Sequence, residues 1–504
     1  MVVYSWPVTE GGKPHALLAV SAAAVYVLSR GPLLPLGFGA DADVWAVAAN
    51  SRLLLSGHYA PSRFPGHPLH EALFALPMAA GPRAANTVNL ALSLAVLVLT
   101  FLLARRWSIT APRVTVLLLA VQPLFWIASA DSTDFMLATA LALSALYAAV
   151  CERPRLGGVL LGLAAGARIE CLAFALPLLW LQPRARLRMA ALTAATVALL
   201  YLPVLTFYLF RSPPVGDLVT SRLGPRERVL HWLVGLWAAL GLVPALALAA
   251  LVARARRRIG DTVRVRQAPA VVGLLLAAAY ALLTLAHPGK AAYYVPALPP
   301  LLLALSSWVE PRGRLILAAA FASYAFVYPD VVDRDARGVH LVLRANNGLL
   351  AKDVVSRVNM AGVSARVDEG RPRTGVVVLG YWLDAWRRGH PEARRVDEVA
   401  GVTLDRRHNA AWRAPDGTVM VHTLSAAEAA QVLARHVPLA CGEGIDAFER
   451  EARGVDLVAL GATPVPVRLL GEAVAERFVL PDMIGCLAAP PPWTDCVRAR
   501  AGAR

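Results

Sequence analysis

Long apolar runs separated by short polar loops recur along residues 16–327. A helix that crosses a bilayer needs about 20 mostly apolar residues, so this pattern predicts a mostly α, polytopic membrane protein. We expect about eleven transmembrane helices, two of them a short pair broken around Arg168. Their expected ranges are 16–36, 84–104, 114–128, 135–150, 156–167, 171–181, 189–210, 229–252, 271–286, 295–309 and 315–327. Residues 69–80 are apolar but too short to span, which favours an interfacial or re-entrant helix.

The pattern changes near residue 330, where polar and apolar positions begin to mix. LLAKDVVSRVN and SAAEAAQVLARHV have the spacing of amphipathic helices, while TGVVVLG and DLVAL predict short buried strands. We therefore divide the chain into a transmembrane domain, residues 1–330, and an α/β domain of unknown role, residues 331–504. No internal repeat links the two parts.

Charge places the loops on two sides of the membrane. The chain is 57% hydrophobic and 17% charged, with a formal net charge of +16, whereas soluble domains carry about 25% charged residues. Arginines gather in alternate loops, at RRW, CERPR, PRARLR, RARRR and EPRGR. This is the positive-inside pattern, so we expect a cytoplasmic N-terminus, an uncleaved signal anchor and an extracytoplasmic C-terminal domain in the cell membrane. No nucleic-acid module accompanies the charge, so membrane lipids are the expected anionic partner.

The most polar segment near the membrane is residues 41–71, which follows the first apolar helix and lies on the outer side. Asp41 and Asp43 form a D-x-D pair there. One carboxylate can take a proton from an acceptor hydroxyl while the other orients it or helps hold a divalent metal ion. The alternative is two ordinary loop carboxylates, with Asp43 as a helix N-cap. The spacing alone leaves both interpretations open.

Further along the same loop, SRFPGHPLHE contributes Arg63, His67, His70 and Glu71. Arginine suits recognition of a phosphate because it offers paired donors. Taken singly, each residue is also typical of the headgroup region, where long polar side chains reach toward water. The grouping of several such residues is what favours a binding site.

Other outer segments carry candidate binding residues. Arg168 and Glu170 interrupt an apolar hairpin, and a lone charge at the bilayer centre costs roughly 2.5–3.5 kcal/mol, so they must pair, face a cavity or lie near the surface. Asp131, in ADSTD, is a candidate binding residue, and both Asp131 and Asp134 suit capping of the following helix. A further group that could bind an anionic headgroup, or simply form an aromatic belt with a lysine, consists of His287, Lys290, Tyr293 and Tyr294.

The order of these segments resembles the GT-C membrane glycosyltransferases, and within them the protein mannosyltransferase and aminoarabinose transferase group. The resemblance rests on Asp41 and Asp43 after the first helix, GHY…SRFPGHPLHEAL, ADSTDFMLATALALSALY, GGVLLGLAAGARIE and HPGKAAYYVPALPPLLLAL. It covers roughly residues 14–330. The C-terminal domain resembles no known family.

The resemblance implies an enzyme that moves a sugar from a polyprenyl-phosphate donor to an acceptor on the outer face, by a single displacement with inversion. It implies that Asp41 or Asp43 is the general base. It also implies that Arg63, Arg168, His287 and Lys290 hold the donor phosphate. Many family members have Asp-Glu where this chain has Asp-Ala-Asp, so the identity of the base stays open, as do the sugar and the acceptor.

Two other functions fit the same pattern. A transporter or lipid flippase would also be polytopic, and an inverted repeat with polar groups at the midplane would favour it. A non-catalytic scaffold would leave Asp43, Arg168 and Lys290 far apart. Among the cysteines, a Cys486–Cys496 disulfide suits an outer domain, but the odd count of five argues against complete pairing.

Overall fold

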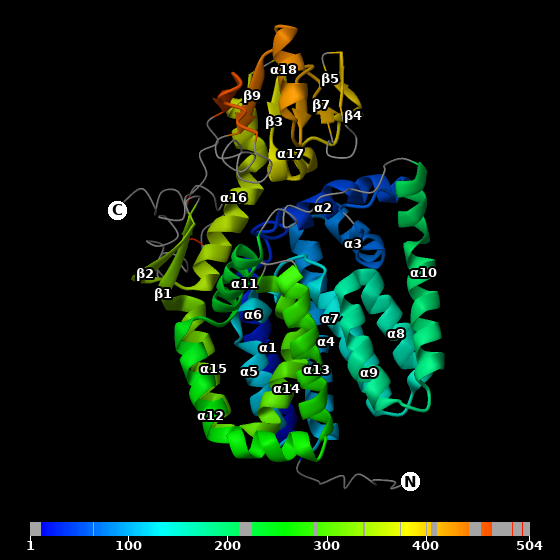
Figure 1. Cartoon of the computed structure of the whole chain (residues 1–504), viewed down its shortest axis with the longest axis vertical. Helices are drawn as coiled ribbons and strands as arrows, with labels where there is room; N and C mark the ends of the chain where they lie inside the picture. Colours follow the sequence, from blue (N-terminus) through cyan, green and yellow to red (C-terminus); the bar gives the residue numbers. More distant parts are fainter. Residues whose placement is uncertain are drawn as a thin grey trace.

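The computed structural model describes residues 12–63, 65–210, 224–286, 291–335, 338–372, 374–399, 401–404, 411–442, 455–465, 486 and 496. An elongated bundle of helices forms one end of the molecule, and a mixed sheet with short helices forms the other (Figure 1). The first described helix begins at the far end of the bundle from the sheet.

The bundle is built from helices that commonly begin at a proline. Proline suits the first turn because the N–H it lacks would have no partner there. The helices are α1 (Gly12–Arg30), α2 (Ala42–Leu55), α3 (Pro68–Ala80), α4 (Pro82–Arg106), α5 (Pro112–Ala120), α6 (Pro123–Ser129), α7 (Phe135–Val150), α8 (Pro154–Ala167), α9 (Ala175–Leu181), α10 (Arg186–Phe210), α11 (Pro225–Leu240), α12 (Leu242–Arg264), α13 (Ala268–Ala286), α14 (Leu298–Trp308) and α15 (Pro311–Phe326). Short 3-10 turns are η1 (Gly31–Leu33), η2 (Ile169–Phe174) and η4 (Ala291–Ala297).

Within the described residues, three helices are long and apolar enough to cross a membrane, namely α4, α10 and α13. Two bent pairs raise the number to five if each pair is one span. The segments expected to span over 114–128 and 229–252 are bent, because α5 and α6 meet at 71° and α11 and α12 at 90°. Pro123 begins α6, and Gly241 at φ +72° separates α11 from α12. The total of about eleven spans stays a prediction.

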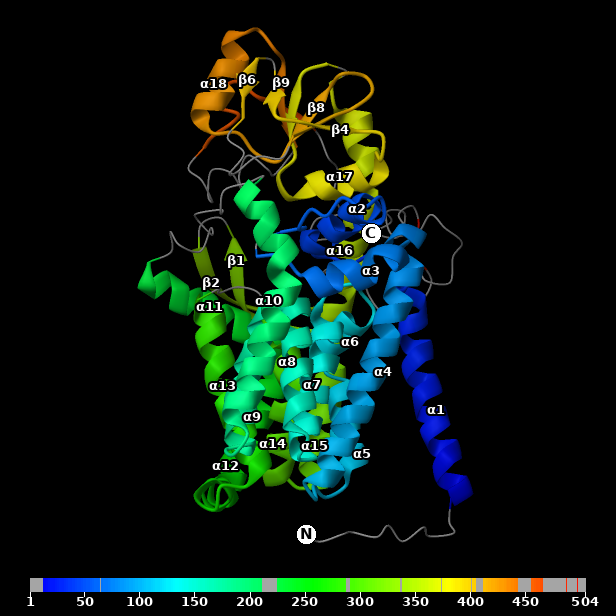
Figure 2. The same ribbon diagram turned by 90° about the vertical axis from the view of Figure 1, so that its right-hand side faces the viewer.

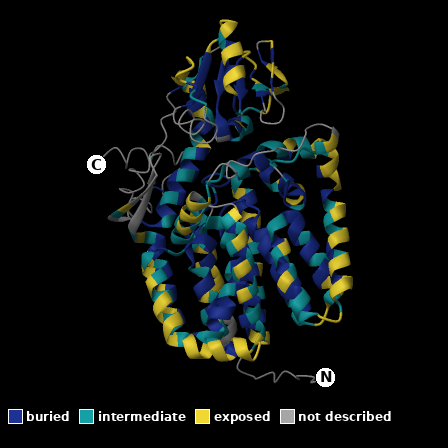
Figure 3. Ribbon diagram, in the orientation of Figure 1, coloured by how far each residue is buried: buried dark blue, intermediate teal, exposed yellow. Residues whose placement is uncertain are grey.

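The bundle exposes apolar side chains along its outer surface, most clearly on α10 (Figure 3). Leu199, Leu202, Leu205 and Leu209 are each more than half exposed there. A large exposed apolar surface on a helix of this length is what contact with lipid requires. The same surface in water would be an aggregation hazard.

The C-terminal part begins with β1 (Val327–Asp335) and β2 (Gly338–Asn347), an antiparallel pair, and continues through the long helix α16 (Leu349–Gly370). A six-stranded sheet follows in the order β10-β9-β3-β8-β7-β4, parallel between β10 and β8 and antiparallel from β8 to β4. Its strands are β3 (Val376–Val378), β4 (Arg394–Val396), β7 (Ala411–Arg413), β8 (Val419–Val421), β9 (Leu439–Gly442) and β10 (Thr463–Val465). The remaining elements are η5 (Gly380–Trp382), α17 (Leu383–Gly389), α18 (Ala426–Ala434), β5 (Glu398–Val399) and β6 (Val402–Thr403).

Most of the expected C-terminal elements are present. TGVVVLG contains β3, and Ser425 starts α18 with a complete capping box to Glu428. The strand expected over DLVAL is wrong, because residues 457–460 form a turn in which Ala459 N–H donates to the Asp456 carboxylate. Cys486 and Cys496 are joined by a disulfide. The division at residue 330 stays a prediction.

The two ends of the molecule are in contact. Helix α17 lies on α2 (Figure 2), and α16 passes beside α6. Arg357 of α16 is fully buried and donates from Nη1 to Ala130 O at 2.6 Å and from Nη2 to Ile127 O at 3.2 Å. These contacts fix the loop between α6 and α7, which carries part of the candidate site.

Candidate active site

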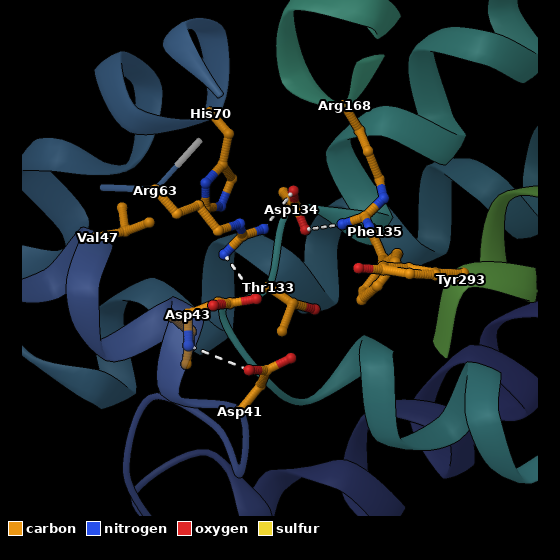
Figure 4. Close-up of a pocket in the computed structure, with 11 residues that line it drawn as sticks. Asp41, Asp43, Val47, Arg63, His70, Thr133, Asp134, Phe135, Arg168 and Tyr293 are labelled. Atoms are coloured by element: carbon orange, nitrogen blue, oxygen red, sulfur yellow. Dashed lines mark hydrogen bonds and ion pairs between the residues drawn. The ribbon is translucent and has the colours of Figure 1, made fainter. Parts of the chain in front are cut away.

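A cluster of charged side chains lies where α2, α3, α7 and α8 meet (Figure 4). Asp41 and Asp43 come from the start of α2, and Arg63 comes from the loop before α3. Asp134 directly precedes α7, and Arg168 follows the last residue of α8. Segments more than a hundred residues apart in the chain are therefore brought together at one end of the bundle. The expectation that the Asp134 side chain caps α7 is wrong, because it makes no capping hydrogen bond.

Asp134 is the centre of the cluster. Its Oδ1 lies 2.8 Å from Arg168 Nη1, and its Oδ2 lies 3.0 Å from Arg63 Nη2 and 3.1 Å from His67 Nδ1. Only 3% of its side chain is exposed. Burial alone would raise the pKa of Asp134, but the charges of Arg168 and Arg63 outweigh it and hold that pKa well below its usual range. Asp134 is thus a fixed negative charge between two arginines.

Arg63 connects this centre to the start of α2. Its Nη1 lies 3.4 Å from Asp43 Oδ2, so one guanidinium bridges the Asp43 and Asp134 carboxylates. Burial alone would lower the pKa of Arg63. The neighbouring carboxylates, of which Asp43 has the largest effect, outweigh burial and raise that pKa. The result is a continuous chain of alternating charges from Asp43 to Arg168.

His67 is neutral in this arrangement. Arg63 Nε donates to His67 Nε2 at 3.0 Å, so the proton sits on Nδ1, which faces Asp134 and the Ala167 carbonyl at 3.0 Å. Burial, reinforced by the charge of Arg63, lowers the pKa of His67 to about 3. His67 therefore orients Arg63 and Asp134 and adds no charge of its own.

The two aspartates of the D-x-D pair differ in their surroundings. Asp41 is the N-cap of α2, where its carboxylate accepts from the Asp43 backbone N–H at 3.1 Å. The expectation that Asp43 would be the cap is wrong; Asp43 lies in the first turn and points toward Arg63, with a third of its side chain exposed. Both line the same small cavity.

The contacts of Arg168 agree both with a structural Arg–Glu pair and with a position at a binding cavity. Arg168 pairs with Glu170 at 3.1 Å, which is the structural pair expected for an interrupted hairpin. It also pairs with Asp134, and its guanidinium lies over the rings of Phe135 at 4.1 Å and Tyr293 at 4.7 Å. Tyr293 lines the cavity beside it.

Two of the expected binding residues face other partners. Glu71 accepts from Tyr59 OH at 2.6 Å and from Ser62 N at 2.8 Å, so it organises the loop before α3. Asp131 accepts from Thr133 and lies 3.9 Å from Arg357, on the side of α16. Neither is among the described residues that line the cavity. His287 and Lys290 lie outside the described residues.

Asp134 was assigned above only to helix capping, and His70, which also lines the cavity, was given no separate role. The available signal for Asp134 was a second acid in ADSTD, at the start of an apolar helix. Its loop is held by α4, where Asn89 donates to the Ala128 and Asp131 carbonyls. No local pattern in the sequence reveals that pairing.

The cavity has a free volume of about 10 Å³, about the space that one water molecule needs. Among the described residues, no group of three or more His, Cys, Asp or Glu side chains is placed to hold a metal ion. Asp41 and Asp43 do not fit a metal as they are arranged, because Arg63 lies against Asp43 and Asp41 caps α2.

No family model and no curated protein matches the chain. Two solved structures are similar to it. They are ArnT from Cupriavidus metallidurans bound to undecaprenyl phosphate (16% identity, TM-score 0.42) and the same protein in the apo state (17% identity, TM-score 0.45). Each match covers 59% of this chain and 60% of the ArnT chain, so the chain spans less than two thirds of the proteins it matches.

Proposed function

We propose that this protein is an integral-membrane glycosyltransferase that moves a sugar from a polyprenyl-phosphate donor to an acceptor hydroxyl. The observation that carries the proposal is the chain of ion pairs Asp43–Arg63–Asp134–Arg168, buried at Asp134 and Arg168 and partly exposed at Asp43, at the end of an apolar bundle. It offers an acid that can accept a proton and two guanidinium groups that can hold a phosphate. This is the minimum that displacement of a lipid phosphate requires.

An apolar groove beside the site supports a lipid-linked donor. It has a volume of about 520 Å³ and runs between α8, α9 and α10, with Leu161, Leu172, Leu179, Val197 and Leu205 in its lining. Tyr201, which also lines the groove, donates from its hydroxyl to Gly66 O at 3.2 Å and Ala165 O at 3.3 Å. Gly66 directly precedes His67, and Ala165 lies three residues before Arg168. We propose that the polyprenyl chain lies in this groove with its phosphate at Arg63 and Arg168.

Asp43 is the better of the two candidates for the base. Asp41 has a structural task at the N-cap, whereas Asp43 is half-buried and touches the arginine that a phosphate would attract. When Arg63 turns toward the donor phosphate, the Asp43 carboxylate becomes available to the acceptor. The acceptor oxygen then attacks the anomeric carbon, its proton passes to Asp43, and the sugar–phosphate bond breaks with its electron pair leaving on the polyprenyl phosphate. One displacement inverts the anomeric centre.

The C-terminal part is proposed to lie on the extracytoplasmic side, with the acceptor. The Cys486–Cys496 disulfide supports this placement, because disulfides persist in oxidising compartments. The alternation of basic loops along the chain supports it independently. The reaction would then take place at the outer membrane surface.

The test is sugar transfer from a polyprenyl-phosphate donor in membranes that contain the full chain, followed by separation of the lipid product. Asp43→Asn is expected to lose at least about 100-fold in rate, the lower range for loss of a general base. Asp41→Asn is expected to keep more of the activity. Asp261→Asn, an exposed acid on α12, is the matched control. Full activity in Asp43→Asn would overturn the assignment, and lipid movement without any transfer would support a flippase instead.

A further inference from the structure

A second polar cavity lies between α2 and the C-terminal sheet, apart from the charged cluster described above. It has a volume of about 90 Å³, room for several water molecules and so for a small oxyanion. Arg52, Arg387, Arg388, His390 and Trp412 contribute to its lining, and we call it the arginine pocket. Among the described residues that line it there is no carboxylate.

The arginines of this pocket are held in place by the protein. Arg387 Nη1 pairs with Asp384 at 2.6 Å, Nη2 donates to Asn50 Oδ1 at 2.9 Å, and its guanidinium lies 3.8 Å above the Trp412 ring. Arg388 Nη2 donates to the Met78 carbonyl at 3.0 Å, near the end of α3. A guanidinium fixed in this way loses little conformational entropy when it binds an anion.

Several donors in the pocket lack a protein acceptor. Among the described residues, no hydrogen-bond partner is placed for Arg387 Nε, Arg388 Nε or Trp412 Nε1, all of which are buried. Burial and then the charge of Arg52 lower the pKa of Arg388, so the arginines repel one another as they stand. Buried donors without acceptors are costly. An anion in the pocket would relieve the repulsion between the arginines, and these enclosed donors would reach it after a small rotation of their side chains.

The position of the pocket relates it to the candidate active site. Helix α2 lines the first cavity with Asp43 and Val47 and the arginine pocket with Ala49 and Arg52. Nine residues separate Asp43 from Arg52, which is about 13 Å along the helix axis. At about 3.6 residues per turn these nine positions also place Asp43 and Arg52 on opposite faces of α2. An elongated molecule with its reactive hydroxyl at Asp43 therefore reaches the arginine pocket with a charged group only by running around the helix.

We propose that the arginine pocket binds an anionic group, a phosphate or a carboxylate, carried by the acceptor. This rests on the proposed glycosyl transfer and adds the chemical class of its second substrate. The pocket is lined by α2 on one side and by α17, the segment that follows it and Trp412 of β7 on the other, so its occupant lies between the bundle and the sheet. That position suits an acceptor better than a bilayer lipid.

The experiment measures binding of inorganic phosphate to the full chain in phosphatidylcholine nanodiscs, by titration calorimetry against chloride at equal ionic strength. Arg387 and Arg388 make structural contacts, so the variants are Arg52→Gln and Trp412→Phe, which remove one guanidinium or one N–H donor. Loss of a charged hydrogen bond weakens binding about tenfold. Arg413→Gln is the matched control, because Arg413 is exposed on the neighbouring position of β7 and faces away from Trp412.

The proposal predicts phosphate binding that Arg52→Gln and Trp412→Phe each weaken about tenfold and that Arg413→Gln leaves unchanged. Absence of binding, or equal binding in all variants, overturns it. Nanodiscs with phosphatidylglycerol separate the two sources of phosphate: unchanged affinity supports an acceptor group, and competition by the lipid overturns that assignment. Asp43→Asn is expected to bind phosphate as the unaltered protein does. If the proposed transfer reaction is wrong, the transfer assay fails while phosphate binding remains; if the pocket is wrong, phosphate binding itself fails.

Discussion

Replacing Asp134 with asparagine removes the charge that holds the candidate active site together. Asp134 is 3% exposed and lies within 3.1 Å of nitrogen atoms of Arg63, His67 and Arg168. Asparagine has nearly the same shape, but it leaves two buried guanidinium groups without their shared carboxylate and turns an amide N–H toward one of them. Breaking a buried ion pair from one side costs about 3–5 kcal/mol, and we expect Asp134→Asn to destabilise the protein by this amount.

The assay is thermal unfolding of the detergent-solubilised chain, followed by size-exclusion chromatography of the remaining monodisperse protein. Asp134→Asn is expected to lower Tm clearly, while Asp261→Asn, at an exposed position, leaves it unchanged. The low pKa of Asp134 sets the pH range. The stabilisation is present above the usual pKa of an aspartate and is lost only as the pH falls through the lower folded-state value.

A double variant distinguishes loss of the Asp134–Arg168 ion pair from a destabilisation that any substitution in the cluster would cause. If the cost of Asp134→Asn comes from the charge left on Arg168, then adding Arg168→Gln should cost less than the sum of the two single changes. Additive losses of Tm would contradict the pairing of Arg168 with Asp134. An unchanged Tm in Asp134→Asn would refute the central role of this carboxylate.

Three further predictions concern other parts of the fold. Burial raises the pKa of Asp131 to about 6 despite Arg357, with Asp353 and Thr133 also facing it. Its contribution to stability is therefore fully present below about pH 4 and lost as the pH rises through about 6, and Asp131→Asn should flatten the pH dependence of Tm in that interval.

In the helix pair that lines the apolar groove, a Cβ added at Gly158 would lie 2.6 Å from the Met189 carbonyl oxygen; we expect Gly158→Ala to lower the unfolding free energy by about 1–3 kcal/mol. Gly260→Ala, which meets no neighbour, should not lower it. Ser425→Ala removes the capping box of α18 and should cost about 1 kcal/mol in the same unfolding assay.

Local patterns predicted the helices and the polar loop after the first helix, because helical periodicity, proline positions and loop charges depend only on residues that are close together in the sequence. Asp41, Asp43 and Arg63 were recognised for that reason. The partner that organises them, Asp134, lies 71 residues beyond Arg63. Whether a polar outer residue faces the cavity depends on packing of distant segments, which is why Glu71 and Asp131 were expected at the site but bind other groups.

Local sequence patterns also could not predict the bends between α5 and α6 and between α11 and α12. Apolar runs at 114–128 and 229–252 are long enough to suggest straight spans, and Pro123 and Gly241 each allow a bend without requiring one. The angles of 71° and 90° follow from how the flanking helices pack. Similarly, the arginines of α17 look like a solvated run in the sequence, and only their contact with α2 makes them a pocket.

Single-turnover transfer by the purified chain is the most direct test of glycosyl transfer with Asp43 as the base. The donor is a polyprenyl-phosphate sugar that carries a label in its sugar. The account predicts transfer with inversion at the anomeric carbon, a rate reduced at least about 100-fold in Asp43→Asn, and an unchanged rate in Asp261→Asn. Transfer at the original rate in Asp43→Asn, or a product that retains the anomeric configuration, would contradict it.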